Sequence, residues 1–143
     1  MAFDWTDSLQ TIDWDELSNL YRIAPLGNKK AADLETVFRN SMFRCFVYDG
    51  GTLIGAGRAL ADGIDCSYLC DIAVHPEYQG RGIGKDIVLR LRDLSKGHRK
   101  IILYAAPGKE PFYLKLGFKR MLTAMAIFEN QAQAVETGLV AEV

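Results

Sequence analysis

The fold is decided by the stretch Val74-His75-Pro76-Glu77-Tyr78-Gln79-Gly80-Arg81-Gly82-Ile83-Gly84-Lys85. It begins where an apolar run that predicts a strand ends, and it leads into apolar residues at helical spacing. Pro76 stops the strand because proline lacks an amide hydrogen. Three glycines at alternate positions then open the helix. Backbone amides at the start of a helix have no partner within it and lie at its positive end, so this turn suits a phosphate group.

Two interpretations of the glycine turn stay open from the residues alone. Glycines at a strand-to-helix turn can be purely structural. They can also let a diphosphate approach the backbone, with added positive charge from Arg81 and Lys85. The dinucleotide fingerprint G-x-G-x-x-G is excluded because Gly80, Gly82 and Gly84 have the wrong last spacing. A P-loop is excluded because Asp86, not serine or threonine, follows Gly84-Lys85.

The segments before the turn predict two helices and then an antiparallel sheet. Asp13 is a candidate helix cap, and helical spacing of apolar residues favours one helix that ends before Pro25 and a second at about Lys30–Asn40. The turn Asp49-Gly50-Gly51-Thr52 between apolar runs predicts a hairpin. The expected strands are a short edge strand around Phe3–Leu9, then Cys45–Tyr48, Leu53–Leu60 and Cys66–His75.

The segments after the turn predict alternating helices and strands. A helix follows the glycines, with Gly97 at its C-terminal cap, and Lys100–Ala105 is a buried-looking strand. A short helix between Pro111 and Gly117, a final strand at Met121–Glu129 and a helix from Asn130 complete the chain. We therefore expect one α/β (α+β) domain over residues 1–143, a mixed, mostly antiparallel sheet flanked by helices.

Composition limits the possible partners and the compartment. The chain has 143 residues, with 17 Lys and Arg against 18 Asp and Glu, so no overall field attracts nucleic acid or anionic membrane. Three cysteines without a regular spacing predict reduced thiols in the cytoplasm. The acidic N-terminus lacks the apolar core of a signal peptide, and no apolar run is long enough to span a bilayer.

Two motifs carry a family resemblance. The pattern Gln79-x-x-Gly82-x-Gly84, after a strand ending in Val-x-Pro, resembles the acetyl-CoA loop of the GCN5-related N-acetyltransferases (GNAT). Further along, Phe112-Tyr113-Leu114-Lys115-Leu116-Gly117-Phe118 is similar to the family's Phe-Tyr-x-Lys-x-Gly-Phe segment. The resemblance covers roughly Phe43–Phe128. It implies the GNAT fold, in which two strands splay apart at the coenzyme A site.

The resemblance also implies roles for individual residues. Tyr113 would be the general acid that protonates the departing coenzyme A thiolate, as a phenol in reach of it can. Many relatives carry an asparagine after the Lys100–Ala105 strand, and this chain has Ala105-Ala106-Pro107-Gly108-Lys109 instead. The implied acetyl-CoA residues are Ile72, Ala73 and Val74 for the pantetheine arm, and Gln79, Gly80, Arg81, Gly82, Ile83, Gly84 and Lys85 for the diphosphate.

The base and the acceptor are less defined. Relatives often carry Glu or His at the positions of Tyr68 and Cys70, which leaves Asp71 or ordered water as the candidate base. The cysteines and the two histidines lack the grouping of a metal site, and a cysteine relay lacks an adjacent base. We expect acetyl transfer to a primary amine, by preference a small molecule of the aralkylamine type. A protein, peptide or aminoglycoside amine, and a catalytically silent acyl-CoA-binding domain, are the alternatives, and a homodimer is compatible with the sequence.

Overall fold

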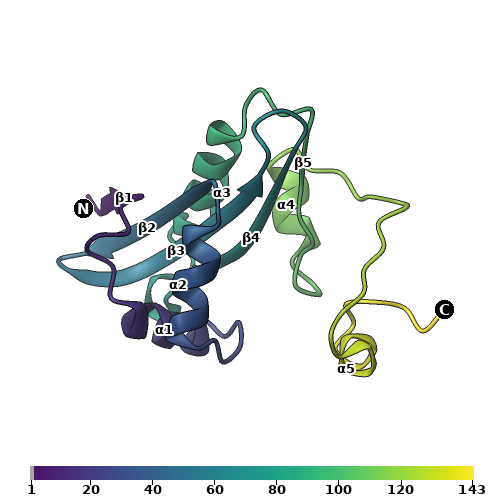
Figure 1. Ribbon diagram of the computed structural model, residues 1–143, viewed down its shortest axis with the longest axis horizontal. Coiled ribbons are helices and arrows are strands. Elements are labelled where there is room, and N and C mark those ends of the chain that lie inside the picture. Colours follow the sequence, from purple (N-terminus) through teal and green to yellow (C-terminus); the bar gives the residue numbers. More distant parts are fainter. Residues whose placement is uncertain (1) are drawn as a thin grey trace. The chain divides into compact units, whose positions relative to one another are not determined.

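The structure, a computed structural model, describes residues 2–143. The chain divides into two compact units, Met1–Leu103 and Tyr104–Val143. The first unit holds a sheet with helices on both faces, and the second holds two short helices and irregular segments (Figure 1). In the part of the chain that is described, no helix has both the length and the apolar character needed to cross a bilayer.

The first unit is built on one five-stranded sheet whose spatial order is the chain order. The strands are β1 (Asp4–Thr6), β2 (Phe43–Asp49), β3 (Thr52–Ala61), β4 (Cys66–Val74) and β5 (Lys100–Ile102). The first four pair antiparallel, and β4 pairs parallel with β5. The predicted mixed, mostly antiparallel sheet is thus confirmed, including the edge strand near the N-terminus and the Asp49–Thr52 hairpin.

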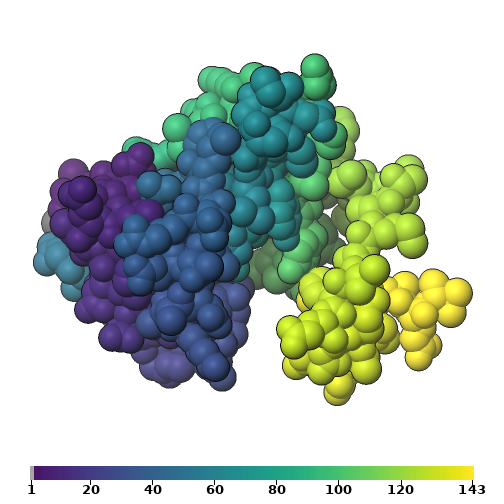
Figure 2. Space-filling model, in the orientation of Figure 1, coloured from purple at the N-terminus to yellow at the C-terminus, as the bar shows by residue number. Residues whose placement is uncertain are grey.

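Two helices cover one face of this sheet, α1 (Trp14–Ile23) and α2 (Ala31–Arg39). The Asp13 carboxylate caps α1 by accepting from the amides of Asp15 at 2.9 Å and Glu16 at 3.2 Å, as predicted. Figure 1 shows both helices in front of the sheet, and in Figure 2 their purple and blue atoms cover much of this side of the first unit. The core that they form is hydrophobic and includes Leu17, Leu20, Tyr21, Leu34, Phe38, Phe46, Ala56 and Ala73.

Helix α3 (Ile83–Leu94) covers the opposite face and packs closely because β3 carries glycine beneath it. A Cβ placed on Gly57 would lie 2.8 Å from Ile87 Cγ2 and 3.1 Å from Leu91 Cδ1. Real Cβ atoms do not approach other carbons that closely, so any side chain at this position would push the helix outward. Close packing of α3 therefore depends on this glycine.

Side chains on strand β4 do not alternate regularly between the two faces of the sheet. The β3–β4 register shifts between Ala56 and Arg58, and Asp71 has a positive φ of 57°. Ser67 contacts Ser95 at the end of α3, whereas Ala73, of the same parity, lies in the core with α1 and α2. An irregularity of this kind adds a residue to one strand and exchanges the faces beyond it.

The second unit contains α4 (Glu110–Lys115) and α5 (Gln131–Glu136). Their bounds agree closely with those of the two helices that the sequence predicts in this part of the chain. The predicted strand at Met121–Glu129 is wrong, because these residues are irregular. Leu122, Met125 and Ile127 are 96%, 96% and 93% exposed, so their apolar pattern buries no surface within this structure. A strand also needs a neighbouring backbone to pair with, which an apolar pattern does not specify. The strand expected at Lys100–Ala105 is shorter and ends at Ile102.

We expect Gly57→Ala to destabilise the protein by about 1–3 kcal/mol, the usual cost of overpacking a core. The added methyl group would displace Ile87 or Leu91 of α3, and urea unfolding followed by circular dichroism measures the loss. The matched control is the double variant Gly57→Ala/Ile87→Ala, since removing the obstructing side chain makes room for the methyl group. Its destabilisation should fall below the sum of the two single effects; strict additivity would contradict the close contact.

Candidate active site: a glycine turn, an open strand edge and an ionic cluster

The glycine turn leaves three backbone amides at the start of α3 without partners among the described residues. Gly80 and Gly82 both adopt left-handed φ angles, 81° and 82°, which explains why glycine occupies these positions. The first helical bond runs from the Asp86 amide to the Gly82 carbonyl at 3.0 Å, and no side chain of the described residues caps the helix. The amides of Ile83, Gly84 and Lys85 are therefore available to a bound anion.

Gln79 holds this turn in place. Its side-chain amide donates to the Val74 carbonyl at 3.1 Å and to the Ala24 carbonyl at 3.5 Å. The first bond ties the turn to the end of β4, and the second ties it to the residue after α1. The geometry gives Gln79 a positioning role in the turn, in addition to the place in the cofactor site that the sequence predicts.

Arg81 is held near the turn by Tyr78 in the preceding 3₁₀ helix, η1 (Pro76–Tyr78). Its guanidinium lies 5.0 Å from the centre of the Tyr78 ring, within cation–π range. The Tyr78 hydroxyl donates to the Asp49 carboxylate, and that hydrogen bond raises the pKa of Tyr78. The hairpin between β2 and β3 thereby helps to fix the basic residue beside the unpaired amides.

The edge of β4 next to the turn is open. β5 pairs with β4 only at Cys66, Ser67 and Tyr68, so beyond Tyr68 no strand within residues 2–143 continues the pairing on that side. The other edge is filled by β3, with Gly55 opposite Val74 and Ala56 opposite Ala73. The predicted pantetheine segment, residues 72–74, thus precedes the turn on an edge that no strand within residues 2–143 pairs with.

Asp71 is the centre of an ionic cluster on the face covered by α1 and α2. Its carboxylate accepts from Arg58 Nε at 2.8 Å and lies 3.6 Å from Lys29 Nζ, while its carbonyl accepts from the Tyr21 hydroxyl at 2.6 Å. Burial, and secondarily the charge of Asp71, raise the pKa of Tyr21 well above its ordinary value, so the phenol keeps the proton that it donates. These bonds hold Asp71 in its uncommon backbone conformation.

The cluster forms one wall of a hollow of about 310 Å³. Its lining residues come from the α1–α2 loop, α2, β3 and β4: Asn28, Lys29, Lys30, Asp33, Leu34, Val37, Arg58 and Asp71. A second hollow of about 250 Å³ shares Asn28, Lys29 and Lys30 and adds Ser18 and Arg22. Sequence patterns do not single out Lys29 or Lys30 as site residues. Arg58 is a charged residue within the apolar strand 53–60, and such a residue indicates that a charged partner lies nearby.

Tyr113 belongs to the second unit, on α4. Its ring makes edge contacts with Phe112 at 5.0 Å and Phe118 at 5.9 Å between ring centres. The Phe118 amide also donates to the Tyr113 carbonyl at 3.2 Å, which closes the helix at Gly117. Burial raises the pKa of Tyr113, so its phenol stays protonated at neutral pH. Packing against Phe112 and Phe118 explains the position of the Tyr113 ring. Its protonated hydroxyl is the group that could donate a proton in a reaction.

Cys70 adjoins the ionic cluster but is a poor nucleophile. Burial is the largest influence on its thiol, and it raises the pKa to about 11 against an opposing effect of Arg58. The thiolate is the reactive form, so the thiol is almost wholly inactive at neutral pH. A covalent cysteine relay through Cys70 therefore has no chemical support in this site.

The sequence profile of the acetyltransferase (GNAT) domain matches residues 41–120. That match spans more than half of the chain and includes the glycine turn, the open edge of β4 and Tyr113. The chain therefore belongs to the GNAT acetyltransferase family.

Individual proteins agree with this assignment. The chain is 31% identical over 118 residues to an uncharacterized N-acetyltransferase ycf52-like of Prochlorococcus marinus, covering 77% of this chain and 64% of that protein. It is 35% identical over 93 residues to the chloroplastic serotonin N-acetyltransferase 2 of Oryza sativa, covering 62% and 46%. The chain thus spans about half to two thirds of these relatives. A probable acetyltransferase of Staphylococcus aureus shares the fold, with a TM-score of 0.79, 24% identity and coverage of 90% and 99%.

We expect alkylation of Cys70 by iodoacetamide to rise about tenfold for each pH unit between pH 7 and 10, because the thiolate fraction grows at that rate below a pKa of about 11. Mass spectrometry of a Cys66→Ser variant isolates the Cys70 signal. Glutathione in the same tubes is the control, and its rate should level off at lower pH. A Cys70 rate that levels off below pH 9 would show that the thiol ionises far more readily than its surroundings imply.

Proposed function

We propose that this chain is an acetyl-CoA-dependent N-acetyltransferase that acetylates the primary amine of a small molecule. The observation that carries the proposal is the junction of β4 and α3, where unpaired helix amides adjoin an unpaired strand edge. Coenzyme A joins a diphosphate to an extended pantetheine arm with two amide groups. The helix amides can bind the diphosphate, and the strand edge can pair with the amide groups of the pantetheine arm. The site therefore complements both parts of coenzyme A.

The donor would lie along this junction. The backbone from Arg81 to Lys85 would hold the diphosphate, with the side chains of Arg81 and Lys85 as mobile countercharges. Ile72, Ala73 and Val74 would pair with the pantetheine arm, which carries the thioester toward the irregular part of β4. Gln79 would keep the two parts in register through its bonds to Val74 and Ala24. An arm contact from an asparagine after β5 is absent from the sequence, so the strand edge would bear more of the binding.

Tyr113 is the proposed general acid. After the amine attacks the thioester carbonyl, the carbon–sulfur bond breaks and the thiolate takes a proton from the phenol. The raised pKa of Tyr113 keeps that proton in place throughout the neutral range. The family motif from Phe112 to Phe118 is the basis for choosing this tyrosine among the six in the chain.

The acceptor amine must lose a proton before it attacks. Both carboxylate oxygens of Asp71 are engaged, one with Arg58 and one with Lys29, so we assign it a positioning role. Ordered water would then remove the proton. The size of the hollow beside Asp71, about 310 Å³, supports a small-molecule acceptor. The rice relative is named a serotonin N-acetyltransferase, which is consistent with an acceptor of this size but does not define its charge.

We expect Gly84→Glu to weaken coenzyme A binding by about 10²-fold, because a carboxylate would stand where the diphosphate lies. The same substitution should leave stability unchanged or raise it by about 0.3–1 kcal/mol, since an acidic side chain suits the first turn of a helix. Isothermal titration calorimetry and thermal melts measure the two effects. Gly84→Ala is the matched control, and it should bind coenzyme A more tightly than the glutamate variant. If both variants lost coenzyme A affinity to the same extent, steric crowding by the side chain, and not repulsion of a diphosphate, would be the cause.

We expect Tyr113→Phe to lower turnover by about 10²-fold or more, the usual contribution of a general acid, with acetyl-CoA affinity nearly unchanged. The assay follows amine-dependent release of the coenzyme A thiol. Because the pKa of Tyr113 is raised, the wild-type rate should show no loss from its deprotonation until the pH exceeds 10. Tyr104→Phe is the control within the same unit. Acetyl-CoA binding without thiol release for any amine in the wild-type protein would instead favour a silent acyl-CoA-binding domain.

A further inference from the structure

The two adjoining hollows between the α1–α2 loop and the sheet carry an excess of positive charge. Their linings contain four cations, Arg22, Lys29, Lys30 and Arg58, against two carboxylates, Asp33 and Asp71. The whole chain has a formal charge of −1, so this excess is a local feature and not a reflection of composition. Charge of one sign concentrated in a concave surface attracts ligands of the opposite sign.

Two of the four cations are already compensated. Arg58 donates to Asp71 at 2.8 Å, and only 13% of its side chain is exposed. Lys29 lies 3.6 Å from the other oxygen of Asp71 and 5.7 Å from the centre of the Tyr21 ring. Both groups are held by the protein itself. They fix the wall of the first hollow and are less free to turn toward a ligand.

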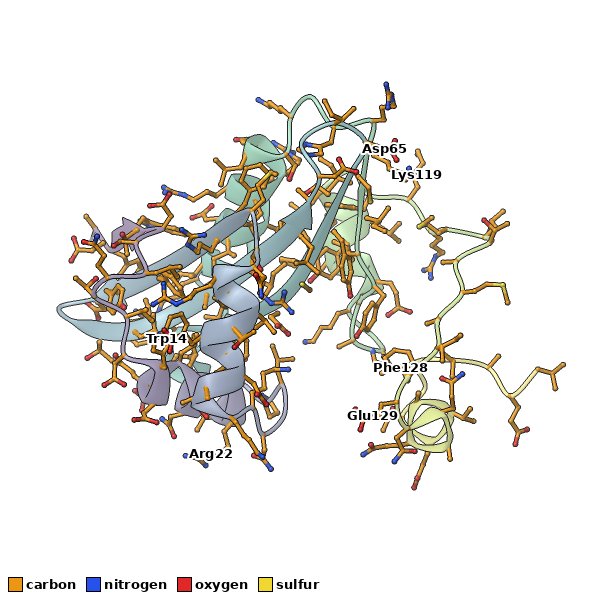
Figure 3. The ribbon with its side chains drawn as sticks, viewed as in Figure 1. Trp14, Arg22, Asp65, Lys119, Phe128 and Glu129 are labelled. Carbon is orange, nitrogen blue, oxygen red and sulfur yellow. The ribbon has the colours of Figure 1, made fainter. Side chains whose placement is uncertain are left out.

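Among the residues that the structure describes, the other two cations have no carboxylate partner. Within residues 2–143, neither Lys30 nor Arg22 forms an ion pair, and Arg22 donates only to the neutral Asn19 side chain. Lys30 lines both hollows, whereas Arg22 lines the second alone. Arg22 stands at the end of α1, where Figure 3 shows it extending from the helix. Lys30 therefore occupies the position from which an ammonium group can serve a ligand in either hollow.

The backbone around Lys30 keeps it in this place. The Ser18 hydroxyl donates to the Lys29 carbonyl, and the Leu26 amide donates to the Tyr21 carbonyl at 2.7 Å. The loop between α1 and α2 is thus fastened to α1 at two points and to β4 through Lys29. A fixed loop positions its cations before the ligand arrives, which lowers the entropic cost of binding.

We propose that the acceptor carries an anionic group, a carboxylate or a phosphate, in addition to its amine, and that Lys30 is the residue that selects it. This inference rests on the proposed acetyl transfer and specifies the acceptor of that same site. Aralkylamines that carry no anionic group would leave Lys30 without a partner, and polycations such as aminoglycosides would be repelled by the excess charge. A small molecule with one amine and one anionic group meets both requirements.

The test compares three acceptors of similar length: butylamine, 4-aminobutyrate and 3-aminopropyl phosphate. For the wild-type protein we expect a KM at least about tenfold lower for one of the two anionic amines than for butylamine, the difference that one charge-assisted contact gives. The two anionic compounds separate a carboxylate preference from a phosphate preference. Lys30→Gln should raise the KM of the preferred compound about tenfold and change that of butylamine less than twofold, and Lys30→Arg should restore the preference.

The matched control is Arg39→Gln, which removes a cation from the other end of the same helix, outside both hollows. It should leave all three KM values unchanged. Equal KM values for the three compounds in the wild-type protein would overturn the proposal of an anionic acceptor but not that of acetyl transfer. An equal rise in the KM of all three compounds in Lys30→Gln would also overturn the proposal of an anionic acceptor.

A second measurement separates this inference from the proposed function. Calorimetric titration of 3-aminopropyl phosphate and 4-aminobutyrate into protein saturated with coenzyme A needs no turnover, and the donor site is then occupied. We expect about tenfold weaker binding of the preferred compound to Lys30→Gln than to Arg39→Gln. If no amine supports thiol release but this difference in binding remains, the proposal of acetyl transfer is wrong and the proposal of an anion site is retained. If the two variants bind alike, the anion site is wrong whatever the kinetics show.

Discussion

The arrangement of the site depends on the backbone of Asp71. A residue with a positive φ in the middle of a strand is costly unless its surroundings hold it. Here Tyr21 donates to its carbonyl, while Arg58 and Lys29 engage its carboxylate. The irregularity exchanges the faces of β4, so that Cys70 and Asp71 both lie near Arg58 while Ile72 turns toward α3. The strand thereby presents an ionic surface to one side of the sheet and an open backbone edge beside the glycine turn.

The proposed donor and acceptor regions of the first unit share residues that hold both in place. Gln79 joins the glycine turn to the end of β4 and to the residue after α1, and the loop that follows α1 carries Lys29 and Lys30. The same short helix therefore borders the proposed coenzyme A site at its end and the cationic hollows through its loop.

Most of the sheet and the glycine turn could be predicted from the sequence because their signals are local. Asp13 caps α1, the Asp49–Thr52 turn closes a hairpin, and the glycines open α3 where their spacing placed them. The cluster around Asp71 could not be predicted because Arg58 meets it only through a strand register that contains an irregularity. The apolar pattern of 121–129 failed for a related reason, since pattern alone does not supply a pairing partner.

The order of the strands has a consequence for how the protein folds. β2, β3 and β4 form consecutive antiparallel pairs joined by short turns, whereas β4 and β5 are parallel and need a crossover through α3. Local pairings form quickly, and pairings across long connections form slowly because loop closure comes first. The glycine turn lies inside that crossover. We therefore expect the antiparallel meander to form early on the folding pathway, and the glycine turn to become ordered late, when α3 docks and β5 joins the sheet.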